Sequence, residues 1–442
     1  MSIKYLLCRK CSTEFRADLK YVCDECFNPL DVIYDFDKIR LSKDIIKNRE
    51  KNLWRYFELL PLRNKNNIVD IGAGYTPLHK ADKLAKKLGL NNLYIKNDTV
   101  NPSFSFKDRP AGVAVSKSIE LGLEAVGAPS TGNLASATAA HAARAGIPCY
   151  IFIPHDIEQA KILQVQAYGA NIIPINGTYD DANRLASYAG DEYNIGIVNV
   201  NVRAYYVEGS KTLAFEVCEQ LGWLAPEHVI VPTGSGALLC AIQRGFREFN
   251  KIGLIKEEKI KISSAQPEGC SPIVDAIQNN SKIIKPVKKP NTIAKSLAIG
   301  EPGDGIFAVN TVKKSGGYGE KVNNDEIREA IRLLASTEGI FTEPGGAVSI
   351  AVLQKLVNQG KIKNFIGIDQ QFEKNNNKIN PKIIHFIRLL WRLPEYQYVW
   401  IIDGDITLTD FNLTKFFSSS SFTKIPDKQE TPRPPNLGPW CP

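Results

Sequence analysis

One lysine stands in an unusual local setting. The stretch NPSFSFKDRP, residues 101 to 110, places Lys107 beside Phe104 and Phe106, where an alanine-rich helix is expected to begin. A cationic side chain is unfavourable there, because the start of a helix dipole attracts anions. Nearby aromatic rings would desolvate the amine and lower its pKa. The setting suits a lysine that holds an aldehyde cofactor as an imine, although an ordinary helix-start lysine remains open.

Two further stretches resemble anion-binding turns. PSTGNLASA (Pro129 to Ala137) and PTGSGALL (Pro232 to Leu239) each join an expected strand to an expected helix. Such turns expose backbone N–H groups at a helix N-terminus, which attracts phosphate or carboxylate. Neither turn has the Gly-Lys-Ser/Thr ending of a nucleotide-binding P-loop or the glycine spacing of a dinucleotide site. Combined with Lys107, the two turns predict a site for a phosphorylated aldehyde and an anionic substrate.

Four of the nine cysteines lie near the N-terminus in two C-x2-C pairs. The pairs are CRKC and CDEC, and their residues are Cys8, Cys11, Cys23 and Cys26. Four thiolates with this spacing can complete a tetrahedral zinc site. All four positions are then filled by protein, so the predicted zinc is structural and stabilises a ribbon too small to fold alone. A redox pair or four unrelated thiols are the alternatives.

The elements that must position these groups follow an α/β rhythm. From residue 91 onward, short β-branched or apolar runs alternate with alanine-rich helical runs, and glycine or proline closes nearly every unit. This alternation predicts parallel sheets covered by helices on both faces. We expect a ribbon over residues 1–35 and a catalytic region over 36–364 with two α/β subdomains, the smaller at roughly 100–205. Residues 365–442 are expected to form a divergent extension ending in a disordered, Ser/Pro-rich tail.

Composition excludes several classes of protein. The 442 residues are 43% hydrophobic and 23% charged, with a net charge of +8 that is spread along the chain. No basic tract marks a nucleic-acid surface, and the mild excess of cations suits anionic small molecules. No apolar run approaches the roughly 18 residues that span a bilayer, and no signal peptide is visible. We therefore expect a cytoplasmic protein with reduced thiols, no nucleic-acid partner and no membrane association.

Six segments occur in an order that is typical of one enzyme family. They are NPSFSFKDR, STGNLASA, YVEGSKTLAFEVCEQLGW, HVIVPTGSG, PNTIAKSLAIGEPGDG and AIRLLASTEGIFTEPGGAVSIAVLQKL. Together they closely resemble the threonine synthases, which are pyridoxal-phosphate enzymes of the tryptophan-synthase-β-like fold, fold type II. The resemblance covers roughly residues 1 to 364 and includes the zinc-ribbon-like segment. It implies conversion of O-phospho-L-homoserine and water into L-threonine and phosphate, by an enzyme that is often a homodimer.

The resemblance also implies roles for individual residues. Lys107 would carry the cofactor as an imine and act as catalytic base and acid, and Asn133 would bond the ring hydroxyl. The residues that would wrap the cofactor phosphate are Gly234, Ser235, Gly236, Ala237 and Leu238. Those that would lie on the substrate side are Ser105, Ser130, Thr131 and Glu343. A further set that could help to hold the substrate phosphate comprises Lys96, Arg109, Asn201 and Lys211.

The sequence departs from the family pattern at two places. Phe104 stands where the family usually has Gly or Ala, which alters one wall of the expected pocket. After residue 364 the chain lacks the turn whose hydroxyl residue faces the pyridine nitrogen, and a strand and a final helix are not visible. The replacement segment faintly resembles a sugar-transferase start, with Asp403 and Asp405 as a metal-binding pair, yet a fused or truncated fragment is the better interpretation. His385 and Trp391 are expected to be core residues of that fragment.

Three other interpretations remain open at this level. A related replacement or elimination enzyme, similar to cysteate synthase or threonine dehydratase, is favoured by the change at Phe104. A cofactor-binding pseudoenzyme is favoured by the altered region after residue 364. Nucleic-acid binding by the ribbon is the weakest of the three, since that segment lacks a dense basic and aromatic surface.

Overall fold

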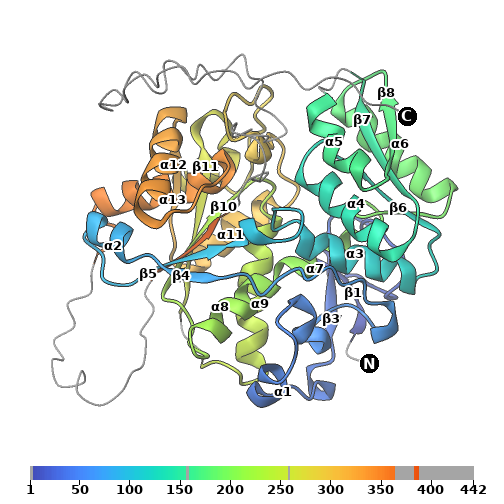
Figure 1. Ribbon diagram of the computed structural model, residues 1–442, viewed down its shortest axis with the longest axis horizontal. Helices are drawn as coiled ribbons and strands as arrows, with labels where there is room; N and C mark the ends of the chain where they lie inside the picture. Colours follow the sequence, from blue (N-terminus) through green and yellow to red (C-terminus); the bar gives the residue numbers. More distant parts are fainter. Residues whose placement is uncertain (1–2, 156–158, 257–258, 364–382, 388–442) are drawn as a thin grey trace, which may run out of the picture. The chain divides into compact units, whose positions relative to one another are not determined.

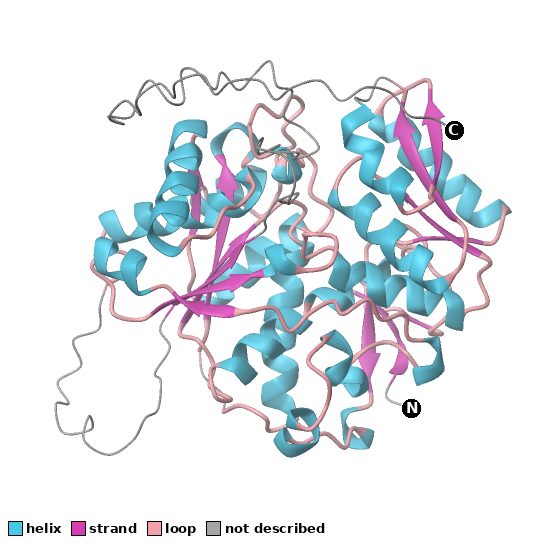
Figure 2. Ribbon diagram, in the orientation of Figure 1, coloured by secondary structure: helices cyan, strands magenta, loops and turns pink. Residues whose placement is uncertain are grey.

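The computed structural model describes residues 3–155, 159–256, 259–363 and 383–387. Three sheets organise this part of the chain, and helices pack around the two larger ones (Figures 1 and 2). The expected α/β class is confirmed, with two parallel-sheet subdomains preceded by a small ribbon. Within the described residues, no helix is long and apolar enough to cross a membrane.

The N-terminal ribbon is a three-stranded antiparallel sheet in the order β2-β1-β3. Its strands are β1 (Ile3–Cys8), β2 (Glu14–Phe15) and β3 (Leu30–Tyr34). Alternate residues of β3 are buried, which is the pattern of a strand with one face on a core. The connector that follows contains η1 (Phe36–Lys38), α1 (Lys43–Lys47), η2 (Leu53–Leu59) and η3 (Lys65–Asn67).

The smaller parallel sheet has the strand order β8-β7-β6-β9. Its strands are β6 (Ala125–Pro129), β7 (Cys149–Pro154), β8 (Asn171–Ile175) and β9 (Ile195–Ile197). The helices of this region are α3 (Asp108–Glu120), α4 (Asn133–Ala145), α5 (Gln159–Ala167), α6 (Tyr179–Glu192) and α7 (Arg203–Ser210). Helix α4 ends at Gly146, whose φ of 70° lies in the left-handed region that glycine adopts without strain.

The larger sheet has six strands in the order β12-β11-β10-β13-β5-β4, and only β4 runs antiparallel to its neighbour. Its strands are β4 (Leu78–Lys80), β5 (Leu93–Asn97), β10 (His228–Pro232), β11 (Lys261–Pro267), β12 (Gly319–Val322) and β13 (Ile383–Ile387). Its helices are α2 (Asp82–Leu88), α8 (Thr212–Gln220), α9 (Ala237–Lys251), α10 (Pro272–Gln278), α11 (Gly305–Ser315), α12 (Asn324–Glu338) and α13 (Pro344–Asn358). Three short 3-10 helices complete the region: η4 (Asp98–Val100), η5 (Glu268–Cys270) and η6 (Lys295–Leu297).

Helices cover both faces of this larger sheet. Ile230 of β10 packs into a core with α12 and α13, whereas its neighbours Val229 and Val231 pack into the core that contains α9 and α11. Successive side chains of a strand point to opposite faces, so a strand buried on both faces must be apolar throughout. This explains why HVIVP reads as a continuous run rather than as an alternating one.

The C-terminal region supplies one strand where the sequence pattern suggested none. Strand β13 lies between β10 and β5 in parallel register, and its His385 pairs with Ile230 on one side and Ile95 on the other. The sheet therefore has a strand at its centre from the divergent region. Trp391, Asp403 and Asp405 lie outside the described residues, as does the expected disordered tail.

A buried ion-pair cluster joins the two subdomains next to Lys107. Arg109 of α3 contacts Asp98 through Nε at 2.6 Å and Glu216 of α8 through Nη2 at 2.8 Å. Lys96 of β5 also binds Glu216, at 2.6 Å, and the side chains of Arg109, Lys96 and Glu216 are fully buried. Burial alone would raise the pKa of Glu216, but the two cations lower it to about 2. The cluster holds two cations and two anions, so its charges balance.

We predict that Glu216→Gln destabilises the fold strongly, because Arg109 and Lys96 would then share too little negative charge in a buried site. The expected loss is about 3 to 5 kcal/mol in the free energy of unfolding, measured by urea denaturation. Glu329→Gln is the matched control, since Glu329 forms only an exposed ion pair on α12. Equal effects of the two substitutions would contradict the structural role of the cluster.

Candidate active site

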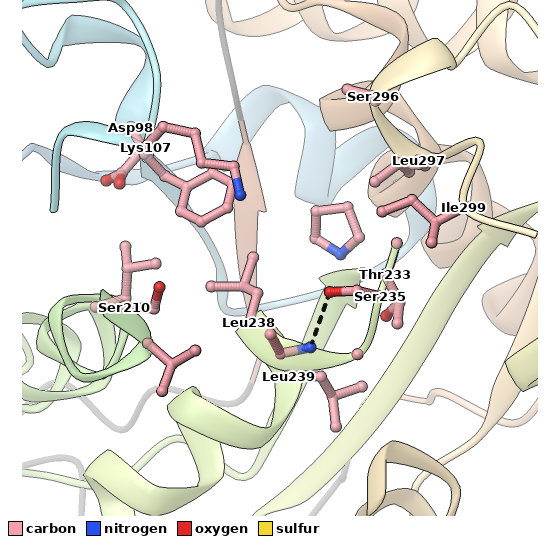
Figure 3. Close-up of a pocket in the computed structure, with 18 of the residues that line it drawn as sticks. Asp98, Lys107, Ser210, Thr233, Ser235, Leu238, Leu239, Ser296, Leu297 and Ile299 are labelled. Carbon is pink, nitrogen blue, oxygen red and sulfur yellow. Dashed lines mark hydrogen bonds between the residues drawn. The ribbon is translucent and has the colours of Figure 1, made fainter. Parts of the chain in front are cut away.

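Lys107 lies immediately before α3, and its amine points into a pocket (Figure 3). The Nζ atom is 3.0 Å from the hydroxyl of Tyr206 on α7. It also lies 4.7 Å from the centroid of the Phe106 ring and 5.6 Å from that of Tyr206. Aromatic groups therefore surround the amine on two sides, as the sequence suggested for Phe106, whereas Tyr206 was not foreseen.

The turn from β10 to α9 forms the opposite wall of this pocket. This turn and the start of α9 line the pocket together with Lys107. The residues that do so are Thr233, Gly234, Ser235, Gly236, Ala237 and Leu238. The N-cap residue of α9, Gly236, has no side chain to cap the helix, and Ser235 Oγ accepts only a weak hydrogen bond of 3.4 Å from Ala237 N (Figure 3). A helix N-terminus of this kind is suited to hold a phosphate by backbone N–H groups.

Glycine is required at the centre of that turn. Gly236 has a φ of +91°, and a Cβ atom there would lie 2.9 Å from Asp304 O and 3.0 Å from Ala308 Cβ. Any larger residue would be strained in conformation and would push the turn away from the segment behind it. The rest of the pocket is mostly apolar, with Leu297 and Ile299 facing the turn (Figure 3). A phosphate turn, an amine and an apolar space between them fit a phosphorylated aromatic aldehyde.

Asn133 and Glu343 meet at the side of this pocket. Asn133 is the first residue of α4 and its Nδ2 lies 3.3 Å from Glu343 Oε2. The other oxygen of Glu343 accepts a hydrogen bond of 3.2 Å from the hydroxyl of Ser296, which lines the pocket. Glu343 precedes α13, so the contact joins the smaller sheet's α4 to a helix of the larger sheet. Two residues that are 210 positions apart in the sequence are thus brought together, although neither is among the described residues that line the pocket with Lys107.

The hydroxyl residues expected on the substrate side occupy turns. Ser105 is buried and its Oγ accepts a hydrogen bond of 3.2 Å from Lys107 N. Ser130 and Thr131 are half-buried in the turn before α4, where Ser130 Oγ accepts a hydrogen bond of 3.3 Å from Gly132 N. None of these three residues is among the described residues that line the pocket with Lys107.

The structure does not bring the expected substrate-phosphate set to the pocket. Lys96 and Arg109 belong to the buried ion-pair cluster, and Asn201 bonds the backbone of Ile195 and Ile197. Lys211 is fully buried between Glu208, at 2.6 Å, and Glu248, at 2.8 Å. Partners inside the fold satisfy each of the four, and none is found among the described pocket-lining residues. The proposed substrate site therefore omits them.

Sequence reasoning missed two residues that shape the site. Tyr206, which bonds the lysine, is the first residue of the segment YVEGSKTLAFEVCEQLGW, so its place in a family-like motif was an available signal. Asp304 supports the phosphate turn from behind through a backbone hydrogen bond of 3.0 Å from its N–H to Ser235 O. Nothing local in PGDG indicates this contact, because Asp304 is 69 positions further along the chain than Ser235.

The four N-terminal cysteines converge as their spacing predicted. Their Sγ atoms all lie within 4.8 Å of one another, with separations of 3.4 Å for Cys8–Cys26 and for Cys11–Cys23. The two C-x2-C pairs form similar turns. Ser12 N–H donates a hydrogen bond to the Cys8 carbonyl, and Phe27 N–H donates one to the Cys23 carbonyl; both residues have positive φ values, 62° and 56°. Thiolates about 2.3 Å from one zinc ion would be roughly 3.8 Å apart, so the cluster fits such an ion with a small adjustment.

The comparisons with known proteins agree with this architecture and site. A family model described as pyridoxal-phosphate dependent enzyme matches residues 69–365. The solved structure of maize serine racemase has the same fold, with a TM-score of 0.57, 19% identity, and coverage of 78% of this chain and 92% of that chain. Fold and site thus define a pyridoxal-phosphate dependent enzyme of fold type II.

Two curated relatives indicate which family within this class the chain resembles. The threonine synthase of Methanocaldococcus jannaschii is 41% identical over 359 residues, which are 80% of this chain and 88% of that protein. The threonine synthase of Methanosarcina acetivorans is 38% identical over 360 residues, 81% and 88% of the two chains. The chain belongs to the threonine synthase family.

Phe104 has a backbone conformation that favours glycine. Its φ is +64°, in the left-handed region, where a bulky side chain is a genuine outlier. A glycine at this position would avoid that strain. Phe104 lies three positions before Lys107, so the strain is stored at the edge of the site.

We predict that Phe104→Gly is more stable than Phe104→Ala. Both changes remove the same ring, but only glycine adopts a φ of +64° without steric cost. The expected difference is about 1 kcal/mol in the free energy of unfolding, measured by denaturant titration of the two variants side by side. An alanine variant at least as stable as the glycine variant would show that residue 104 is not strained.

Proposed function

We propose that this chain converts O-phospho-L-homoserine and water into L-threonine and phosphate. The observation that carries the proposal is that Lys107 and a phosphate-type glycine turn line one pocket, in a chain of the threonine synthase family. Cofactor and substrate are both anionic, and the site offers two helix N-termini that attract anions: that of α9 for the cofactor phosphate and that of α4 for the substrate.

The described residues suit pyridoxal phosphate. The backbone N–H groups of residues 234–238 would hold its phosphate, Asn133 would bond its ring hydroxyl, and Lys107 would bind its aldehyde. Glu343 and Ser296 keep the Asn133 amide oriented through the contacts at 3.3 and 3.2 Å. When bound, the cofactor supplies a conjugated ring that accepts electrons from Cα of the amino acid.

Lys107 would move the protons of the reaction. Its amine serves as general base and acid at Cα and Cβ of the substrate, and the Tyr206 hydroxyl at 3.0 Å keeps it oriented. Phosphate leaves from Cγ and one water adds its hydroxyl at Cβ, so the atoms of substrate and water are all found in threonine and phosphate. The turn before α4, which contains Ser130 and Thr131, is the proposed binding site of the substrate carboxylate.

Lys107→Ala is expected to abolish the visible absorbance that the wild-type enzyme shows with pyridoxal phosphate. It should also lower phosphate release from O-phosphohomoserine by at least about 10³-fold, since the proton-transfer group is lost. Lys83→Ala, at an exposed lysine of α2, serves as the control and should behave as wild type. Wild type without lysine-dependent colour would refute the enzyme proposal. Colour without phosphate release would favour a related replacement or elimination enzyme, or a pseudoenzyme.

We also propose that the cysteine cluster binds one structural zinc ion. Cys11→Ser should lower the zinc content of the purified chain from about one ion to near zero, measured by elemental analysis, because a hydroxyl is a poor zinc ligand beside three thiolates. Cys149→Ala, at a buried cysteine of β7, should leave the zinc content unchanged. Wild-type protein that is folded but free of zinc would contradict the proposal. A cytoplasmic homodimer remains a prediction from composition and resemblance.

A further inference from the structure

Arg9 connects the cysteine cluster to the interior of the catalytic region. It lies between Cys8 and Cys11 in the first knuckle, yet its side chain is only 6% exposed. Its Nε binds Asp31 Oδ1 at 2.6 Å, and its Nη1 forms an ion pair with Asp304. The guanidinium also lies 5.4 Å from the ring centroid of Phe307 on α11. The side chain thus leaves the ribbon and enters the larger subdomain.

Asp304 is the residue that supports the proposed cofactor-phosphate turn from behind. Its carboxylate is fully buried and pairs with both Arg9 and Arg203 of α7. Its N–H donates to Ser235 O at 3.0 Å, and its own carbonyl lies 2.9 Å from the position of a Cβ on Gly236. The backbone of Asp304 therefore packs directly against the two central residues of the turn, and a shift of one must move the other.

Arg9 belongs to a chain of alternating acidic and basic side chains that runs from the first knuckle to α7. Asp31 also pairs with Arg244 of α9, which in turn pairs with Glu208 of α7. Acidic and basic groups alternate from the knuckle to α7, and the side chain of Asp304 has no solvent exposure that could replace a lost partner. A buried carboxylate that loses a cation must move or recruit another one. The position of Arg9 therefore helps to determine the position of Asp304.

We propose that Arg9 is a positioning residue that couples metal binding at the four cysteines to the affinity of the enzyme for the cofactor phosphate. A metal would fix the knuckle backbone through Cys8 and Cys11, and the knuckle holds Arg9 against Asp304. This inference rests on the proposed zinc site and cofactor turn, and it gives the ribbon a role beyond its own stability.

The test compares two ligands that differ only in the phosphate group. The affinities of the full-length apoenzyme for pyridoxal phosphate and for pyridoxal are measured by absorbance titration, and their ratio reports on the phosphate turn. Arg9→Met should lower this ratio about tenfold, and Arg9→Lys should restore part of it, because it retains a cation for Asp304. Lys10→Met is the matched control, since Lys10 is the exposed neighbour in the same knuckle, and should leave the ratio unchanged.

A second arm removes the metal. Treatment of the zinc-loaded wild type with a chelator should lower the ratio by about as much as Arg9→Met does, with circular dichroism showing that the chain stays folded. In Arg9→Met the same treatment should have no further effect, because the link is already broken. An unchanged ratio after chelation of the folded wild type would overturn the coupling to the metal.

The outcomes separate the coupling from the function on which it rests. A wild type that binds both ligands equally would refute the proposed phosphate turn itself. A wild type that prefers pyridoxal phosphate, and keeps this preference in Arg9→Met, would overturn the coupling alone. Equal loss of affinity for both ligands in Arg9→Met would also overturn it, because Arg9 would then stabilise the fold without acting on the turn.

Discussion

The buried charge of Arg109 constrains much of this structure. A guanidinium without solvent exposure requires compensation, and Asp98 and Glu216 provide it from two different elements of the larger subdomain. Because α3 begins at Asp108, this compensation also fixes where α3 starts relative to β5 and α8. Lys107 lies two positions before Arg109, so its position is fixed together with the start of α3. The Lys107 amine is therefore positioned by an ion-pair cluster that reaches the pocket through Asp98, whereas Arg109, Lys96 and Glu216 are not among the described residues that line it.

The sheet topology explains why the other groups gather around the same amine. The turn that carries Asn133 follows β6 and the turn that carries Gly236 follows β10, so both lie at the carboxyl ends of parallel strands. In open α/β sheets ligands bind at these ends, where loops and helix N-termini are exposed. The site forms where the two subdomains turn these ends toward a common space, and the contact between Asn133 and Glu343 closes its side.

Local patterns predicted the parts of the site that local physics determines. Continuous apolar runs such as HVIVP identified strands covered on both faces, a glycine turn identified one wall of the pocket, and C-x2-C spacing identified the four-cysteine cluster. The failures concern residues whose partners are distant. Lys96 and Lys211 have the chemistry of phosphate ligands, but Glu216, Glu208 and Glu248 neutralise them inside the fold. The strand β13 was missed because its neighbours lie more than 150 and 280 positions earlier in the chain.

The contact between Arg9 and Asp304 also has a consequence for the order of assembly. The two residues are separated by 295 positions, so the ribbon leaves the ribosome long before Asp304 has been made. At roughly 5 to 20 residues per second this interval is on the order of 15 to 60 s. The four cysteines of the proposed zinc site are available during most of that time, whereas the proposed phosphate turn cannot acquire its support until residue 304 has been made. Metal binding can therefore precede completion of the cofactor site during the synthesis of each chain.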